Sequence, residues 1–363
     1  MKFGQDRKHQ WTSFIETLFI ILLCEKIYNH SYVSGAYNVQ VTLGFTLLSI
    51  MLLVSKQCKL IKQDIISLMF ILLMILYGFS KETIRYGLTF FSLMVWNKIS
   101  GINMSKVHRV ITILGAGFSL MDLVKGYERI SGYSAGSPTL FSCASLISFT
   151  YFLFKKQHIK WDYFFAGVNL LMIIKTQSSS TLIVLICMIL YKVFINVIKK
   201  YGINPQVTKF CIFIGCIMVA FFLVFNFQSA LGIIHRGNRN ASTSTRLGIY
   251  QVFAKLFIKN PITILIGYGG GFTQSYIKTN WGTASHLPVH QDILMFACEY
   301  GVLGLVVMYR FLIKHYKFNF LLWVVLVLTS FHNIILSPLI LCLLVLTSKS
   351  MNSQYGSKSS LWS

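Results

Sequence analysis

The longest polar interruption of this apolar chain runs from Ser242 to Gly304, and the rest of the fold is arranged around it. It reads Ser242-Thr243-Ser244-Thr245-Arg246, then Asn260-Pro261, then Gly267-Tyr268-Gly269-Gly270-Gly271, and finally Glu299-Tyr300-Gly301-Val302-Leu303-Gly304. Before this stretch, one hydrophobic run follows another, joined by short basic connectors. We therefore expect the apolar runs to hold a membrane-embedded site, and this stretch to carry its chemistry.

The composition is that of a membrane protein with many spans. Of the 363 residues, 55% are hydrophobic and only 12% are charged, whereas about a quarter of the residues in a soluble domain are charged. Apolar runs of about 18 to 22 residues, long enough to cross a bilayer as helices, recur along the chain. The expected fold class is all-α: a polytopic transmembrane helical bundle of about twelve spans.

The predicted spans define four segments of the chain. Nine spans occupy residues 1–227, a long extracytoplasmic loop with an interfacial helix occupies 228–291, three spans occupy 292–348, and a cytoplasmic tail occupies 349–363. The spans are predicted at Trp11–Tyr28, Ala36–Ser55, Asp64–Ser80, Thr83–Ile99, Val107–Leu123, Pro138–Phe154, Trp161–Ile174, Thr181–Ile198, Phe210–Phe227, Asp292–Ile313, Phe318–Phe331 and Asn333–Ser348.

The positive charge indicates orientation and not a nucleic-acid partner. The formal net charge is +23, but Lys and Arg are concentrated in every second connector, as the positive-inside rule requires of cytoplasmic loops. Both termini should then face the cytoplasm, and the loop at 228–291 should lie outside. The eight Cys residues are scattered, so neither a disulfide framework nor a zinc site is expected.

The long loop contains a candidate anion site. Thr243, Ser244 and Thr245 are suitable N-caps for a helix from Arg246 to Asn260, which Pro261 would end. A helix N-terminus favours a bound phosphate, and guanidinium groups bind phosphate oxygens well. Arg236 and Arg239 precede Arg246 and would converge with it, although contacts with lipid head groups would explain the same residues. Gly267, Gly269 and their neighbours fit either a close backbone approach to a ligand or a tight turn.

The end of the loop supplies candidate acid–base groups. His286 and His290 precede the span that opens at Asp292, and a histidine at such a position can accept a proton near neutral pH, although an ordinary interfacial histidine is the alternative. Asp292 would either orient His290 or cap the following span. Glu299 lies inside that span, where a carboxylate is costly, so it should face the bundle interior and pair with a cation or donate a hydrogen bond.

These motifs resemble the Wzy-type polymerases of O-antigen and capsular polysaccharides, in the O-antigen polymerase/ligase superfamily. The family pattern appears here as Arg246, Pro261, Gly267-Tyr268-Gly269, His290-Gln291 (with Gln in place of the usual Asn) and Glu299-Tyr300-Gly301-Val302-Leu303-Gly304, and an earlier segment as Arg129, Gly132 and Pro138. The resemblance implies a glycosyltransferase in the bacterial cytoplasmic (inner) membrane. It would move a glycan from undecaprenyl pyrophosphate onto a new lipid-linked repeat unit at the outer face.

The resemblance also implies roles for individual residues. Arg246 and Arg129, with Arg236 or Arg239, would bind the pyrophosphate. His290, or else His286, would be the base, and Asp292, Glu299, Gly267 and Gly269 would support the site. A chain-length regulator is the implied partner, beside the lipid bilayer. Since no paired carboxylates or Cys/His clusters call for a metal, we expect an inverting transfer that uses neither metal nor cofactor.

Three other functions compete with this interpretation. The ligase branch of the same superfamily uses a lipid A core as acceptor. A polyprenyl-phosphate-sugar transferase would carry acidic residues in its first outer loop, but Asn29 to Gly35 contains none. A lipid-linked oligosaccharide flippase or other transporter would have related halves and short loops, unlike the long stretch from Gln228 to Gln291.

Overall fold

The structure is a computed structural model, and it describes residues 2–28, 35–54, 61–99, 101–131, 138–178, short stretches between 181 and 189, 200–202, 240–281, 292–316 and 337–355. Within these ranges, the regular secondary structure is entirely α-helical and contains no strand. The all-α prediction is therefore confirmed for the part of the chain that is described.

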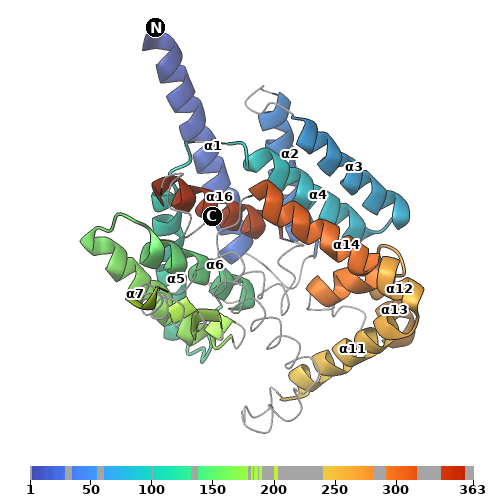
Figure 1. Cartoon of the computed structure of the whole chain (residues 1–363). Helices are drawn as coiled ribbons and strands as arrows, with labels where there is room; N and C mark the ends of the chain where they lie inside the picture. Colours follow the sequence, from blue (N-terminus) through green and yellow to red (C-terminus); the bar gives the residue numbers. More distant parts are fainter. Residues whose placement is uncertain are drawn as a thin grey trace. The chain divides into compact units, whose positions relative to one another are not determined.

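The first seven predicted hydrophobic segments each form a helix close to the predicted position (Figure 1). These helices are α1 (Lys2–Tyr28), α2 (Gly35–Val54), α3 (Lys62–Tyr77), α4 (Lys81–Trp96), α5 (Met104–Val124), α6 (Pro138–Phe154) and α7 (Lys160–Thr176). They are followed by α11 (Asn240–Ile258), α12 (Pro261–Ile266), α13 (Phe272–Trp281), α14 (Asp292–Tyr316) and α16 (Pro338–Tyr355). The predicted spans at Phe210–Phe227 and Phe318–Phe331, and most of Thr181–Ile198, lie outside the described residues.

Several of the described helices are apolar enough to lie in a membrane. Among the described residues, α5 and the Asp292–Tyr309 part of α14 are long and apolar enough to cross a bilayer, and several other apolar helices are shorter. One face of α3 is exposed and apolar, which suits lipid better than water; it carries Ile65, Ile66, Met69, Leu72, Leu73 and Leu76. The count of twelve spans stays a prediction.

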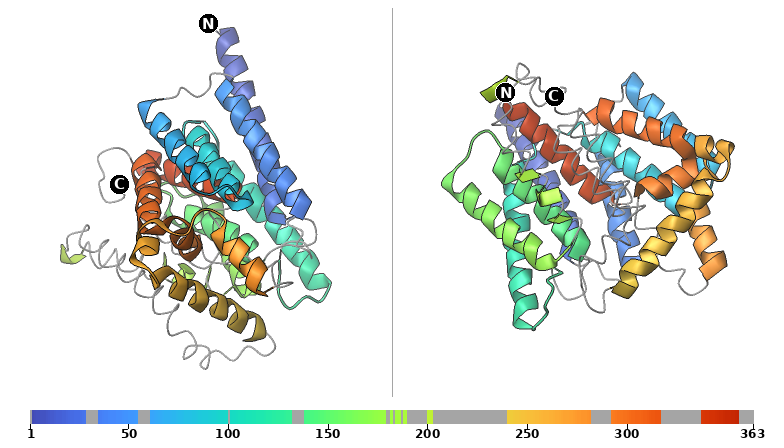
Figure 2. Two further views of the ribbon diagram at one scale, coloured as in Figure 1. Left: turned by 90° about the vertical axis from the view of Figure 1, so that its right-hand side faces the viewer. Right: turned by 60° about the horizontal axis from the view of Figure 1, so that its bottom comes forward.

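The chain forms two compact units. The first unit comprises Met1–Ile61, Phe91–Leu190 and Ser337–Ser363, and the second comprises Lys62–Phe90 and Tyr191–Leu336. This division follows spatial contacts and differs from the four topological segments expected from hydropathy, because helices distant in sequence pack together. Figure 2 gives two further views of the helices of each unit.

The core of the first unit is built around Trp96. Its ring packs against Phe19, with centroids 4.7 Å apart, and against Phe45, with centroids 5.2 Å apart. Its indole N–H donates to Ser49 Oγ at 2.9 Å, so the one polar atom of the side chain is satisfied inside the core.

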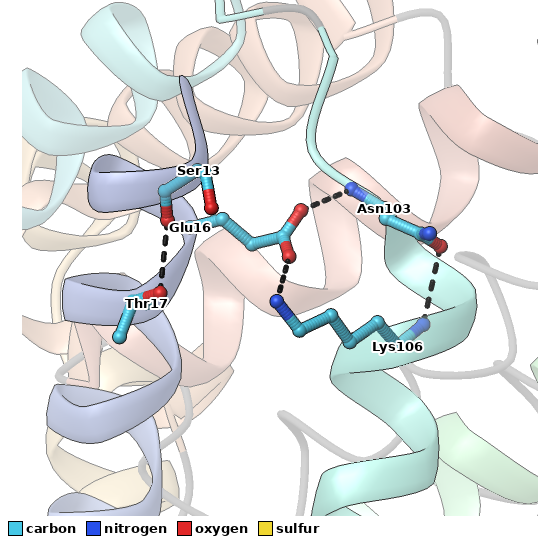
Figure 3. A network of polar contacts seen from close by, with 5 residues as sticks. All are labelled: Ser13, Glu16, Thr17, Asn103 and Lys106. Carbon is cyan, nitrogen blue, oxygen red and sulfur yellow. Dashed lines mark hydrogen bonds and ion pairs between the residues drawn. The ribbon is translucent and has the colours of Figure 1, made fainter. Parts of the chain in front are cut away.

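Contacts at the ends of helices in the first unit join the segment at 97–106 to α1 and to α16. Glu16 of α1 is buried, and its carboxylate pairs with Lys106 Nζ at 2.8 Å and accepts a hydrogen bond from the Asn103 N–H, also at 2.8 Å (Figure 3). Lys349 Nζ of α16 donates to the carbonyl oxygens of Asn97 and Ile99. The connector at 98–109 and the C-terminal helix therefore meet, as both should if they share one side of a membrane. Which side that is stays a prediction.

In the second unit, the predicted span Asp292–Ile313 is not one straight helix. Gly301 has a left-handed φ of 67° with ψ of −172° and interrupts α14. Figure 1 shows the two halves meeting at an angle beside α12. The halves, 292–300 and 302–316, are about 14 and 23 Å long at 1.5 Å per residue. Neither alone spans a hydrocarbon core of about 30 Å, so hydropathy predicted the apolar segment correctly but missed its break.

Candidate functional site

The glycine-rich turn, residues 267–271, begins where α12 ends. Asn260 is extended, with φ of −140°, and its side chain accepts from the Ile262 N–H at 2.9 Å, which caps α12, with Pro261 at the first helical position. Gly267 then ends this one-turn helix with φ of 79°. The predicted stop of the preceding helix at Asn260-Pro261 is confirmed, since α11 ends at Ile258.

The glycine-rich turn is bonded to the break in α14. The Tyr268 N–H donates to the Cys298 carbonyl oxygen at 2.8 Å, and the Gly269 N–H donates to the Glu299 carbonyl oxygen at 2.9 Å. In an unbroken helix these two carbonyls would accept from residues 302 and 303. The break at Gly301 leaves them without that partner, and the turn supplies the N–H groups that satisfy them.

Glycine is required on both sides of this contact. A Cβ at Gly267 would lie 2.4 Å from the Glu299 carbonyl carbon, and a Cβ at Gly301 would lie 2.3 Å from the Leu265 carbonyl oxygen. Both residues also have positive φ, which other residues rarely adopt. The space beside these two glycines is thus filled by backbone of the same chain, as in the tight-turn alternative.

A third element, the connection between α3 and α4, completes the cluster, and the sequence motifs did not point to it. Tyr77 Oη donates to the Gly267 carbonyl oxygen at 3.2 Å, and Tyr300 Oη donates to Thr83 Oγ1 at 3.1 Å. A Cβ at Gly270 would lie 2.6 Å from the Gly78 carbonyl oxygen. The sequence does show an interruption of the apolar run at Gly78 to Ser80. This interruption does not indicate which other segment the connection would contact.

Glu299 faces the interior, as predicted. It is fully buried and accepts a hydrogen bond from Thr273 Oγ1 at 2.6 Å, so in this bond the carboxylate accepts and does not donate. Thr273 lies in the first turn of α13, and the bond therefore ties α13 to the end of the first half of α14. Asp292 is buried in the first turn of α14, where a carboxylate favours the helix dipole.

The prediction for the start of the Arg246 helix was wrong. The helix α11 begins at Asn240, so Arg246 is the seventh helical residue, and Thr243 to Thr245 are inside the helix and do not cap it. Ser and Thr hydroxyls can bond to a carbonyl in the preceding turn, and for this reason they are tolerated within a helix. The argument that placed a phosphate at a helix N-terminus beside Arg246 therefore does not hold.

The buried residues of α11 pack against other helices of the same unit. Phe253 is fully buried, its ring lies 5.6 Å from that of Tyr276 on α13, and its carbonyl oxygen is 3.4 Å from Cys298 Sγ on α14. Tyr268 Oη donates to the Leu256 carbonyl oxygen at 2.9 Å, which joins α11 to the glycine-rich turn. These contacts give the helix that was predicted to lie in the membrane interface a buried face against protein.

The backbone position of Arg246 relates it to α14. Arg246 precedes Ile249 by three residues and Phe253 by seven in α11, and Ile249 and Phe253 are buried. In Figure 1, α11 and the first half of α14 both run toward α12. Their N-terminal halves, which include Arg246 and Asp292, thus lie on the same side of the Phe253–Cys298 contact.

The remaining predicted site residues lie in the first unit or outside the described residues. Arg129 belongs to the first unit, where its Nε donates to the Thr176 carbonyl oxygen at 2.5 Å and fastens the α5–α6 connection to the end of α7. Arg236, Arg239, His286 and His290 lie outside the described residues. In the part of the chain that is described, no group of three or more His, Cys, Asp or Glu residues could hold a metal ion.

The described part of the chain is helical and largely apolar, and it contains a broken helix whose break is bonded to a glycine-rich turn. Residues 164–309, about two fifths of the chain, match the family model for O-antigen ligase. The chain therefore carries an O-antigen ligase family domain, which confirms the resemblance to the O-antigen polymerase/ligase superfamily. The matched range contains both the glycine-rich turn and the break in α14. No curated protein and no solved structure matches the chain.

This family domain supports a role in polysaccharide synthesis, with a lipid-linked oligosaccharide as the substrate class.

Proposed function

We propose that the protein is a polysaccharide polymerase. It transfers a glycan from undecaprenyl pyrophosphate onto a new lipid-linked repeat unit at the outer face of the bacterial cytoplasmic membrane, with inversion and without a metal. The observation that carries this proposal is the O-antigen ligase family domain over residues 164–309. It includes α11, which carries Arg246, and the start of α14, which follows His290.

The chemistry needs few groups, because the leaving group is already activated. Arg246 neutralises the departing pyrophosphate, with Arg129, Arg236 and Arg239 as further cationic candidates. The acceptor hydroxyl gives its proton to His290, or to His286 if His290 is not the base.

Asp292 and Glu299 support the site from α14. Asp292 is only two residues after His290 in the sequence and is buried, which favours an orienting role as well as a favourable interaction with the helix dipole. The Glu299 carboxylate fixes α13 through Thr273, and the Glu299 carbonyl fixes Gly269. Gly267 and Gly269 hold the turn.

The ligase and transporter functions can be distinguished from the polymerase function by the reaction products that each forms or fails to form. A ligase of the same superfamily joins the glycan to a lipid A core and leaves the repeat-unit lipid unextended. A flippase or other transporter of lipid-linked oligosaccharides moves the same lipid across a bilayer and forms no glycosidic bond, so it does nothing detectable in detergent, where no bilayer separates two faces.

The test uses the purified full-length chain in detergent with an undecaprenyl-pyrophosphate-linked repeat unit, and measures product length on a gel. The wild type is expected to form chains of several repeats. Arg246→Ala and His290→Ala should each lower the rate by about 100-fold or more, through loss of charge stabilisation or of the base. Lys255→Ala is the matched control, because Lys255 is exposed on the same helix, and it should retain the wild-type rate.

The outcomes are distinct. Transfer only to a lipid A core acceptor would assign the ligase function. No product with either acceptor, together with transport in vesicles, would assign the transporter function. Long chains from both the Arg246 and His290 variants would remove these residues from the reaction centre.

A further inference from the structure

The connection between α3 and α4, together with the first turn of α4, contributes a chain of hydrogen-bonded hydroxyl groups beside the glycine-rich turn. Ser80 Oγ lies 2.9 Å from Thr83 Oγ1 and also accepts from the Thr83 N–H at 3.1 Å. Tyr300 Oη donates to Thr83 Oγ1 at 3.1 Å. Thr83 and Tyr300 are buried, and their positions lie 217 residues apart in the sequence. This chain therefore joins the start of α4 to the residue just before the break in α14.

The glycine-rich turn sits directly on these hydroxyl groups. A Cβ added to Gly270 would lie 2.2 Å from Thr83 Oγ1 and 2.7 Å from Tyr300 Oη, and one added to Gly271 would lie 2.3 Å from the Ser80 Cβ. Backbone that approaches this closely has no freedom to shift toward α4. The hydroxyl groups of Ser80, Thr83 and Tyr300 thus limit how closely the glycine-rich turn can approach α4.

The glycine-rich turn also bonds to two other helices, α11 and α14. Tyr268 bonds to α11 through its hydroxyl and to α14 through its N–H, and these are the helices whose N-terminal halves include Arg246 and Asp292. Any displacement of the turn would move α11 relative to the first half of α14. A displacement of about 1 Å at a reaction centre can lower a rate by about 100-fold.

We propose that Thr83 and Tyr300 are positioning residues for the glycosyl transfer: their hydrogen bond seats the glycine-rich turn and thereby sets α11 against α14. This inference rests on the proposed function and deepens it, since it assigns a role to the start of α4, which lies outside the matched family domain. Neither residue touches the substrate in this role. Each acts through the turn.

The test removes one hydroxyl group at a time. Tyr300→Phe keeps the ring that packs against Phe296 at 4.6 Å and against Tyr86 at 6.2 Å, and Thr83→Val keeps the side-chain shape. Both should lower kcat by about tenfold with KM for the repeat-unit lipid unchanged, because a misplaced site slows the chemistry. Thr83→Ser restores the hydroxyl and should restore kcat.

A distance measurement tests the positioning role independently of enzyme activity. Spin labels at the exposed positions Lys81 and Lys255 measure the distance between α4 and α11. The wild type and Thr83→Ser should give one narrow distance distribution, and Tyr300→Phe and Thr83→Val should give a broadened or shifted one.

The possible failures are distinguishable. If the wild type extends no lipid-linked glycan, the proposed function fails, while the distance distributions still decide whether the hydroxyl chain positions α11. A wild-type kcat in both variants overturns the positioning role. So does a lowered kcat with an unchanged distance distribution, and so does a loss of thermal stability with normal turnover.

Discussion

The segments that form α5 and the Asp292–Tyr309 part of α14 both have the length and hydropathy of a membrane span, yet glycine has opposite consequences in them. In α5, Gly115 and Gly117 lie within a continuous helix from Met104 to Val124. In α14, Gly301 takes a left-handed φ and interrupts the helix. Hydropathy does not separate the two cases. The difference lies in what surrounds the backbone at each glycine.

Side chains support α5, whereas backbone supports α14. The His108 ring nitrogens of α5 lie 3.0 Å from Ser148 Oγ on α6 and 3.0 Å from Thr347 Oγ1 on α16, while the α14 break is held by N–H groups of the glycine-rich turn. A helix with complete internal hydrogen bonding needs only side-chain partners. A broken helix must find backbone partners for the groups it exposes.

The largest expected effect is that of Gly301→Ala. The new Cβ would lie 2.3 Å from the Leu265 carbonyl oxygen, and Ala would be forced into φ of 67°. We expect a loss of more than about 4 kcal/mol of stability, from backbone strain together with overpacking. The measurement is the amount of protein in the membrane fraction and its thermal unfolding in detergent.

The matched control is Gly117→Ala in α5, where an added Cβ meets nothing within 4 Å and the helix is continuous. It should leave the stability unchanged or raise it by about 0.4–1 kcal/mol. If Gly301→Ala and Gly117→Ala had the same stability, the break in α14 would not be obligatory. Glycine would then have the same role in α5 and in α14.

An intermediate effect is expected where buried charges support the first unit. Lys155 Nζ pairs with Asp162 Oδ2 at 2.6 Å, and both side chains are buried. Lys155→Met should cost about 3 kcal/mol, because it leaves a buried carboxylate without its close cationic partner. Thermal unfolding in detergent measures the loss.

Two further variants decide the cause of that loss. Lys156→Met alters the adjacent exposed lysine and should change the stability by no more than about 0.5 kcal/mol. Lys155→Met combined with Asp162→Asn removes both charges and keeps an acceptor for the Ile159 N–H, which now donates to Asp162 at 2.7 Å. A double variant no more stable than Lys155→Met alone would exclude the stranded charge as the cause.

The sequence was sufficient for features that depend on local composition. Apolar runs gave the positions of α2 to α7, and Pro138 and Phe154 bound α6 as predicted. Asn260-Pro261 marked the end of α11, because proline excludes helical backbone before it. Burial of Glu299 also followed, because a carboxylate in an apolar run must face the protein.

The features that failed depend on partners remote in sequence. Thr83 and Tyr300 form a hydrogen bond across 217 positions, and nothing in either local segment indicates the other. The start of α11 at Asn240 was missed because Thr243 to Thr245 are equally compatible with a cap and with a helix interior. The Gly301 break was missed because a glycine is tolerated in a helix until a tertiary contact favours its left-handed conformation.

The smallest expected effect is at the start of α5, and it tests how local the support of that helix is. Asn103 caps α5 by accepting from the Lys106 N–H at 3.2 Å, while its own N–H donates to Glu16 of α1 at 2.8 Å (Figure 3). Asn103→Ala removes only the side-chain cap and should cost about 1 kcal/mol. Asn103→Ser can still cap and should recover most of this loss in the same thermal assay. Because the backbone bond to Glu16 survives in both variants, a loss as large as that of Lys155→Met would mean that the Asn103 side chain supports the α1–α5 contact as well, and the stability of α5 would then depend on a remote partner, as that of α14 does.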